Sequence, residues 1–231
     1  WIDRGGTFTD VIGKHPDGSL RACKLLSENS EQYDDAAAEG IRRMLLAWAD
    51  DGRADAPIEA IKMGTTVATN ALLERTGTPT ALLVTQGFAD ALEIGYQNRP
   101  DIFALHIRKP TPIYDRVMEI GERIGADGTV LCPLVKDDVL ESLTACRRDG
   151  IGSVAICLMH GYRYSQHEEA VASLASEVGF EQVSVSHDVE ALIKFISRAE
   201  TTLADAYLTP VLTHHIDQLR KALINIGAPR R

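Results

Sequence analysis

WIDRGGTFTDVIGK opens the chain, over residues 1–14, and this stretch predicts how the fold begins. It reads as a short apolar start, a turn at Gly5-Gly6 and a second strand, TFTDVIGK. The stretch fits neither the dinucleotide pattern G-x-G-x-x-G nor the P-loop pattern G-x-x-x-x-G-K-[ST]. After the turn HPDGS, the segment LRACKLL reads as a third strand. The sequence therefore predicts an antiparallel meander whose first turn contains a pair of glycines.

Alternating strand and helix patterns follow this meander. Segment 29–50 begins with capping-type residues, carries acids in its first turn and has apolar residues at helical spacing, which predicts a helix. Further along, the patterns predict strands over 58–64, 80–85, 114–124, 153–161 and 182–188, and helices over 66–75, 88–94, 136–150, 167–179 and 201–224. Residues 97–112 hold several prolines and basic side chains, so a long loop is expected there. This order favours a parallel sheet with helices on its faces.

Composition narrows the class of protein. Of 231 residues 45% are apolar and 25% charged, and no apolar run approaches the roughly 20 residues that a membrane helix needs. The formal net charge of −9 disfavours nucleic acid as a partner. The cysteines lack C-x-x-C spacing and the histidines lack ligand spacing, so neither a disulfide framework nor a structural metal is expected. No secretory leader is visible, and we expect a cytoplasmic protein with free thiols.

The glycine turn is the first candidate site. A tight turn between two strands can expose consecutive backbone N–H groups, which form a nest for anionic oxygens. Asp3 ends the first strand beside this turn, and a carboxylate next to bound phosphate requires a cation between them, such as Mg²⁺. Thr7 and Thr9 can add hydroxyl donors. The alternative is an ordinary hairpin with a glycine-rich bend, and the pattern by itself does not separate the two.

MGTTVATNALLER, over residues 63–75, is the second candidate. Small and polar side chains stand where a strand passes into a helix: Gly64, Thr65, Thr66, Thr69 and Asn70. A helix N-terminus offers unpaired N–H groups and the positive end of a dipole, which suit an anionic or carbonyl group. The alternative is that Thr65 or Thr66 merely caps the helix.

TQGFADALEIGYQNRP, over residues 85–100, is the third candidate. Gly87 ends a strand, and Asp90, Glu93 and Arg99 follow it. Arg99 could hold a substrate carboxylate through two parallel hydrogen bonds. The alternative is that these charges form a solvated face.

Five segments of the chain, taken together, resemble the amino-terminal region of the hydantoinase A and 5-oxoprolinase family. They are IDRGGTFTD, KLLSENSEQYDDAAAEGIRRML, MGTTVATNALLERTGTPTALLVTQGFADALEIGYQNRPDIF, CLMHGYRY and SRAETTLADAYLTPVL, and they cover the chain nearly end to end. The variant D-R-G-G-T with LLSEN-x-EQY is most similar to the ATP-dependent 5-oxoprolinase branch.

The resemblance implies an α/β fold of the actin, Hsp70 and sugar-kinase type, a ribonuclease H-like mixed sheet that begins with three antiparallel strands and continues in βαβ units. It also implies ATP and Mg²⁺ as cofactors. The residues then take these expected roles: catalysis by Asp3, Thr65, Thr66 and Asn70; nucleotide binding by Gly5, Gly6, Thr7, Thr9 and Asp10; substrate binding by Gly64, Thr69 and Arg99; and metal binding by Asp3.

The resemblance further implies a piece of a larger enzyme. Such folds close a nucleotide between two lobes, and a second glycine-glycine-threonine turn is absent from this sequence. We expect residues 1–200 to form the family's amino-terminal domain and residues 201–231 a helix leading into the next domain, in a chain that is inactive alone.

The implied reaction is the ATP-dependent opening of 5-oxo-L-proline to L-glutamate. The alternatives are another hydantoin or lactam hydrolase, a ketone carboxylase subunit, or a non-catalytic nucleotide-binding module of actin-like fold. The expected partners are a small lactam substrate and the remaining domains or a partner subunit, and self-association into a homo-oligomer stays open.

Overall fold

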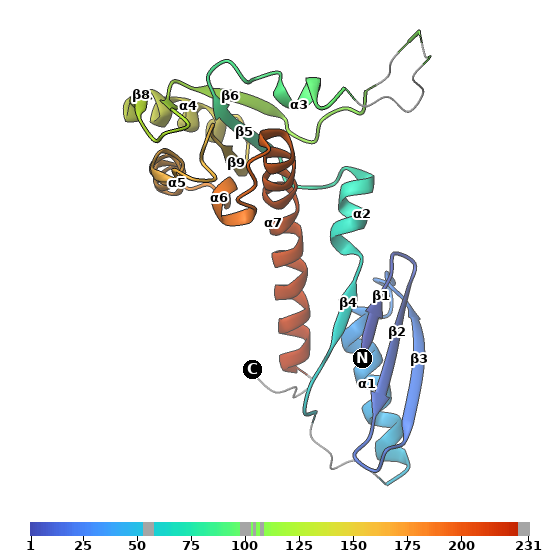
Figure 1. The fold of residues 1–231 in the computed structure, drawn as a ribbon. Helices are drawn as coiled ribbons and strands as arrows, with labels where there is room; N and C mark the ends of the chain where they lie inside the picture. The colour runs from blue at the N-terminus through green and yellow to red at the C-terminus, as the bar shows by residue number, and fades with distance from the viewer. Residues whose placement is uncertain (53–57, 98–102, 104, 107–108, 226–231) are drawn as a thin grey trace. The chain divides into compact units, whose positions relative to one another are not determined.

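The computed structural model describes residues 1–52, 58–97, 103, 105, 106 and 109–225, and its chain divides into two compact units (Figure 1). Unit 1 combines Trp1–Thr76 with Val211–Arg231, and unit 2 is the continuous segment Gly77–Pro210. The predicted domain boundary at residue 200 lies inside the long helix α7 (Phe195–Asn225). The chain passes from unit 1 to unit 2 after Thr76 and back to unit 1 after Pro210.

Unit 1 contains a four-stranded mixed sheet of order β3-β2-β1-β4. Its strands are β1 (Ile2–Arg4), β2 (Phe8–Lys14), β3 (Leu20–Leu26) and β4 (Met63–Thr65). The first three pair antiparallel, as the meander predicts, whereas β4 pairs parallel to β1. The strand expected over 58–64 is shorter than predicted, because only its end reaches the edge of β1.

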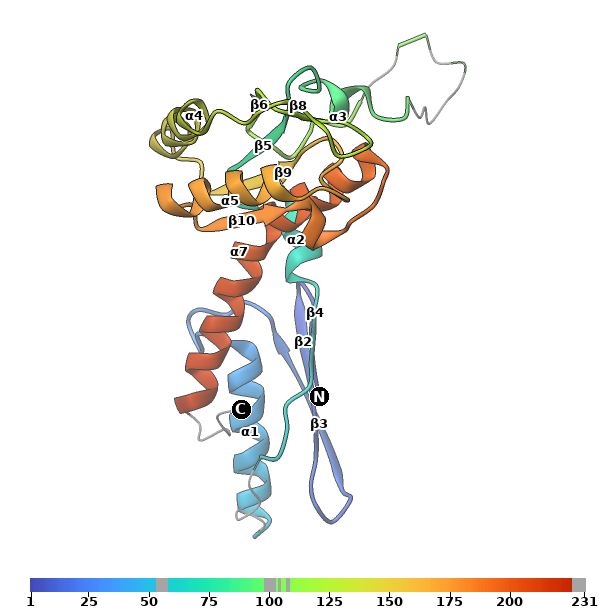
Figure 2. The same cartoon turned by 60° about the vertical axis from the view of Figure 1, so that its left-hand side comes forward.

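Helix α1 (Ala36–Asp50) runs alongside the strands of unit 1 (Figure 2). Asp35 caps its N-terminus, since the Asp35 Oδ1 atom accepts the Ala38 N–H over 2.8 Å. Apolar side chains of the helix and the sheet form one buried cluster, to which Leu219 of α7 adds a further contact. A Cβ atom on Gly40 would lie 2.5 Å from Val11 Cγ2, so the absence of a side chain there lets α1 approach the sheet closely.

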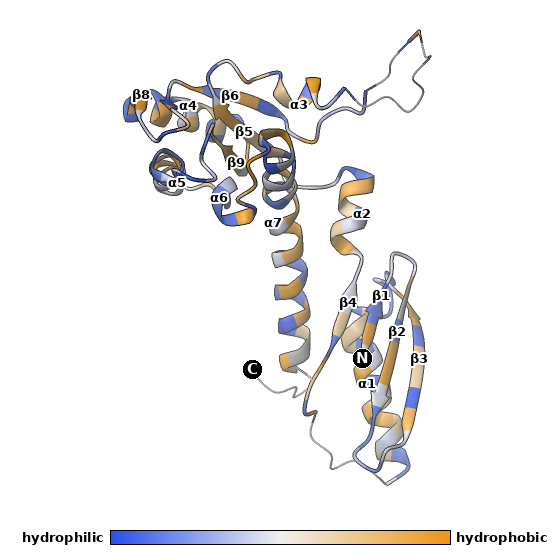
Figure 3. Ribbon diagram, viewed as in Figure 1, coloured by the Kyte–Doolittle hydropathy of each residue, from blue (hydrophilic) through white to orange (hydrophobic). Residues whose placement is uncertain are grey.

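Unit 2 contains a four-stranded sheet of order β10-β9-β5-β6, in which all neighbouring strands are parallel. The strands are β5 (Thr80–Thr85), β6 (Arg116–Ile120), β9 (Ser153–Cys157) and β10 (Gln182–Val185). Every residue of β5 and β9 is buried, and both strands are largely hydrophobic in Figure 3. Helices α4 (Lys136–Arg148) and α5 (Gln166–Val178) contribute to the larger core cluster of this unit. The α/β class and its βαβ order are thus confirmed.

The remaining elements are short. They are α2 (Val67–Glu74) in unit 1, and α3 (Ala91–Ile94), β7 (Arg123–Ile124), β8 (Val130–Cys132) and α6 (Ser186–Val189) in unit 2. None of the helices in the described part of the chain is long and apolar enough to cross a membrane. The loop expected over 97–112 lies in part outside the described residues.

Several predicted elements of unit 2 end earlier or begin elsewhere. The strand expected over 114–124 is interrupted after Ile120, where the buried Glu122 turns toward Thr85 and its carboxylate accepts the Thr85 hydroxyl. The strands expected over 153–161 and 182–188 end at Cys157 and Val185. The helix expected from residue 88 begins at Ala91, and the last helix begins at Phe195 rather than at residue 201.

A buried charged network ties the carboxyl ends of β9 and β10 to α5 and α7. Glu168 and Arg198 are 0% and 1% exposed. The Glu168 carboxylate accepts the Leu158 N–H and the Ser186 hydroxyl through Oε1, at 2.8 and 2.6 Å. Its Oε2 atom lies 2.7 Å from His187 Nδ1. The Arg198 guanidinium donates to Ser186 Oγ, Leu158 O and Glu168 Oε1 over 2.6, 3.0 and 3.5 Å.

Candidate functional site

Strand β1 brings the first two predicted stretches together within unit 1. In the sheet register Asp3 lies between Asp10 of β2 and Gly64 of β4. One residue further, the Arg4 carbonyl accepts the Thr66 N–H over 3.2 Å, which fixes the start of α2 against the end of β1. The glycine turn and the Gly64–Asn70 segment therefore lie next to each other, as a shared site would require.

The side chain of Asn70 lies against the glycine turn. A Cβ atom on Gly6 would lie 3.0 Å from Asn70 Nδ2, so a side chain at position 6 would crowd the Asn70 amide. The turn itself is closed by a hydrogen bond of 3.0 Å from the Gly5 N–H to Phe8 O. Within the described residues no acceptor is bonded to the N–H of Gly6 or Thr7. These two donors can therefore bind an anion.

Asp3 and Asp10 face the same side of the sheet but differ in their partners. Both Asp10 carboxylate oxygens accept hydrogen bonds from Lys24 Nζ, at 2.8 and 2.9 Å. Asp3 is exposed and has no hydrogen-bond or ion-pair partner among the residues that the structure describes. Its Oδ1 atom would lie 3.8 Å from a Cβ atom on Gly64, so the glycine leaves the space beside this carboxylate open.

The threonines of the two stretches differ in their environment. Thr9 is wholly buried, and its hydroxyl lies 3.0 Å from Ser27 Oγ. Its side chain therefore faces the interior of unit 1, whereas the sequence predicts a contact with the nucleotide. Thr65 Oγ1 accepts the Val67 N–H over 3.2 Å, which favours the capping alternative for this residue. Thr66 Oγ1 lies 3.4 Å from Arg4 O, and Thr7 and Thr69 are exposed.

The third stretch belongs to unit 2, whereas the sheet with the glycine turn belongs to unit 1. Gly87 has φ of +89° and its N–H donates to Glu119 Oε1 over 2.8 Å, so a glycine suits this turn. Burial, followed by the Glu93 carboxylate, raises the pKa of Tyr114. Arg99, the expected carboxylate clamp, lies outside the described residues.

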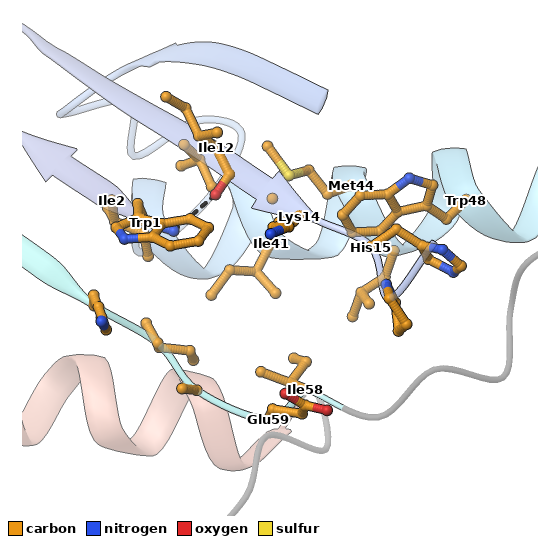
Figure 4. A pocket seen from close by; sticks show the side chains of 17 residues that line it. Trp1, Ile2, Ile12, Lys14, His15, Ile41, Met44, Trp48, Ile58 and Glu59 are labelled. Atoms are coloured by element: carbon orange, nitrogen blue, oxygen red, sulfur yellow. Dashed lines mark hydrogen bonds between the residues drawn. The ribbon is translucent and has the colours of Figure 1, made fainter. Parts of the chain in front are cut away.

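Two hollows of unit 1 border the strands. One is a cavity of about 510 Å³, lined among others by Trp1, by Gly13 of β2, and by Met44 and Trp48 of α1. Figure 4 shows Trp1, Met44 and Trp48 around it. It lies at the end of β2 remote from the glycine turn, because Gly13 and Lys14 line it and Phe8 does not. This cavity therefore does not contain the predicted nucleotide residues.

The second hollow adjoins the turn. Its volume is about 640 Å³, and it is lined by Arg4, Ser27, Glu28, Asn29, Ser30, Glu31, Tyr33 and Asp34. Most of these residues belong to the LLSEN-x-EQY motif, which is also part of the resemblance to the family. The motif was visible in the sequence, but the position of these residues beside the glycine turn depends on the pairing of β2 with β3.

A family model described as the hydantoinase/oxoprolinase N-terminal region matches residues 1–179. The chain belongs to the hydantoinase/oxoprolinase family. The match includes the glycine turn, the Gly64–Asn70 segment and the LLSEN-x-EQY motif, so the expected family relationship is confirmed.

Individual relatives of this hydantoinase/oxoprolinase chain agree with the family model. It is 42% identical to 5-oxoprolinase 1 of Arabidopsis thaliana over 93% of its length, and 38% identical to a 5-oxoprolinase of Saccharomyces cerevisiae over 96%. The crystal structure of an ATP-dependent caprolactamase from Pseudomonas jessenii covers the whole chain with a TM-score of 0.81 and 29% identity. The chain spans 19% and 20% of the two oxoprolinases and 34% of the caprolactamase chain.

Proposed function

We propose that this chain is the amino-terminal part of an ATP-dependent cyclic amide hydrolase that opens 5-oxo-L-proline to L-glutamate. The observation that carries the proposal is a glycine turn with two N–H groups, beside the Asp3 carboxylate, none of which has a partner among the residues that the structure describes. The names of the related 5-oxoprolinases support the substrate, and the name of the caprolactamase supports both the use of ATP and the class of bond.

The proposed chemistry is the transfer of the ATP γ-phosphoryl group to the amide oxygen, which makes the ring C–N bond cleavable by water. The protein's main task in such a transfer is to position and neutralise phosphate oxygens. The N–H groups of Gly6 and Thr7 would bind these oxygens, and Asn70 Nδ2 would add a side-chain donor next to Gly6.

A magnesium ion fits the residues present. The Asp3 carboxylate is exposed and unpaired among the described residues, and Gly64 leaves the space beside it free. Asp3 would hold the hydrated ion, which supplies positive charge to the phosphate oxygens. Asp10 differs, because Lys24 already neutralises it. The remaining domains or a partner subunit would complete the nucleotide site, so the 231-residue chain alone is expected to be inactive.

The experiment that tests this proposal is steady-state kinetics on the longer protein that contains this chain, with Asp3→Asn as the variant. The change keeps the side chain's shape and removes its charge. We expect kcat to fall on the order of a hundredfold or more, as for the loss of one strong electrostatic contact in the transition state. Asp50→Asn is the matched control, because Asp50 is an exposed carboxylate at the end of α1. Equal kcat values for the wild type and Asp3→Asn would show that Asp3 holds no ion.

The substrate is tested separately with 5-oxoproline, hydantoin and caprolactam, each with ATP. The proposal is supported if 5-oxoproline is the one lactam of the three that stimulates release of phosphate from ATP. Release that is stimulated by hydantoin or caprolactam instead would assign that compound as the substrate. ATP binding without turnover of any lactam would favour a non-catalytic nucleotide-binding module.

A further inference from the structure

Ser27 lies directly behind the glycine turn and makes two hydrogen bonds to it. The Ser27 hydroxyl donates to Gly5 O over 2.6 Å, and the Ser27 N–H donates to Thr7 O over 2.9 Å. Ser27 itself is 5% exposed. The carbonyl groups on both sides of Gly6 are therefore held by one buried residue.

This arrangement determines where the Gly6 N–H points. The carbonyl of Gly5 and the N–H of Gly6 belong to one planar trans peptide unit, so they point in opposite directions. Since Ser27 holds the Gly5 carbonyl, the Gly6 N–H is directed to the side of the turn away from Ser27. Rotation of this peptide unit would break the bond of 2.6 Å and leave a carbonyl without its partner.

The Thr9 hydroxyl forms a hydrogen bond with the Ser27 hydroxyl. A serine hydroxyl has a single proton, and Ser27 uses it for Gly5 O, so the Thr9 hydroxyl at 3.0 Å must be the donor to Ser27 Oγ. Thr9 is 0% exposed, so its hydroxyl is out of contact with bulk solvent. The result is a directed chain of hydrogen bonds from Thr9 through Ser27 to Gly5.

We propose that Ser27, supported by Thr9, is a positioning residue that directs the Gly6 N–H toward the phosphate oxygens of ATP. This inference rests on the proposed function, since it concerns the same nucleotide turn. It gives the serine of LLSEN-x-EQY a physical role: the motif holds the turn in the orientation that binds an anion, while Ser27 itself does not touch the nucleotide.

The test compares equilibrium binding of ATP and of adenosine to the longer protein and to four variants. Ser27→Ala removes the bond to Gly5, Thr9→Val removes the supporting hydroxyl at nearly constant shape, and Thr9→Ser keeps that hydroxyl. Ser173→Ala is the matched control, because Ser173 is an exposed serine on α5, in unit 2. We expect Ser27→Ala to raise the Kd for ATP roughly tenfold, as for one lost hydrogen bond, and to leave the Kd for adenosine unchanged. Thr9→Val should raise the Kd for ATP less, and Thr9→Ser and Ser173→Ala should match the wild type.

The outcomes separate this inference from the function on which it rests. An unchanged Kd for ATP in Ser27→Ala overturns the inference, and so does an equal loss of ATP and adenosine affinity together with a lower melting temperature. If Ser27→Ala does not fold, the contrast between Thr9→Val and Thr9→Ser decides in its place. A wild type that binds ATP without hydrolysing it in the presence of 5-oxoproline refutes the proposed function, yet the comparison of ATP and adenosine still tests Ser27. A wild type that binds no ATP refutes both.

Discussion

Removing the buried charge of Arg198 should strongly destabilise unit 2. In Arg198→Met the Leu158 carbonyl and the Ser186 hydroxyl lose donors at 3.0 and 2.6 Å, and the fully buried Glu168 loses its positive partner. Breaking a buried ion pair by removing one partner costs about 3–5 kcal/mol. Each kcal/mol lowers the melting temperature of a chain of this size by about 2–4 °C, so a decrease of roughly 6–20 °C is expected.

Urea and thermal unfolding followed by far-ultraviolet circular dichroism measure this loss. Arg148→Met is the control, because the Arg148 side chain is 81% exposed, and its stability should stay within about 0.5 kcal/mol of the wild type. The double variant Glu168→Gln/Arg198→Met should be more stable than Arg198→Met, since it removes the unpaired buried charge. A loss below about 1 kcal/mol in Arg198→Met, or a double variant less stable than the single one, would refute the reasoning.

Two further predictions concern titratable groups. Burial raises the pKa of the Cys157 thiol to about 12, so Cys157 should not react with Ellman's reagent in the native protein at pH 8. The exposed Cys132 should react in a fast phase, and Cys132→Ser should abolish this phase. Rapid labelling of Cys157 under native conditions would contradict its burial. Burial, together with Arg4, lowers the pKa of His215 below its ordinary value of 6.5, against the opposing effect of Asp35. The folded state thus binds fewer protons than the unfolded state, so its stability should be full above pH 6.5 and decline as the pH falls toward the lowered pKa. In His215→Gln the urea midpoint should decline less between pH 8 and pH 5 than in the wild type. Equal declines would show that His215 does not contribute.

Local patterns in the sequence were sufficient for the meander of unit 1 and for the two central strands of unit 2. The meander follows from strands separated by short turns, and β5 and β9 follow from short apolar runs that are buried on both faces. The end of the strand at Ile120 could not be predicted in this way. It depends on Glu122 reaching Thr85, a residue far away in the sequence, and no local preference encodes that bond.

The residues of the candidate site also differ in whether local patterns in the sequence could indicate them. Asp3, Gly5, Gly6 and Asn70 could be found because glycines and polar residues at the ends of strands and helices are visible as patterns. Thr9 has the same pattern, but the register of β2 and β3 turns its side chain into the interior, where it meets Ser27. The role of Ser27 requires that register too, and only the structure supplies it.

The division of unit 1 into two separated segments affects the order in which the protein can fold during synthesis. Its sheet and α1 come from Trp1–Thr76, yet Leu219 and His215 of its core come from the second segment, which is synthesised after all of unit 2. Domains generally fold as units while the chain leaves the ribosome, amino-terminal parts first. Here that order is reversed at the last step. Unit 2 has its full sequence once Pro210 has emerged, whereas the apolar cluster of the first segment lacks its contact with Leu219 until that residue follows.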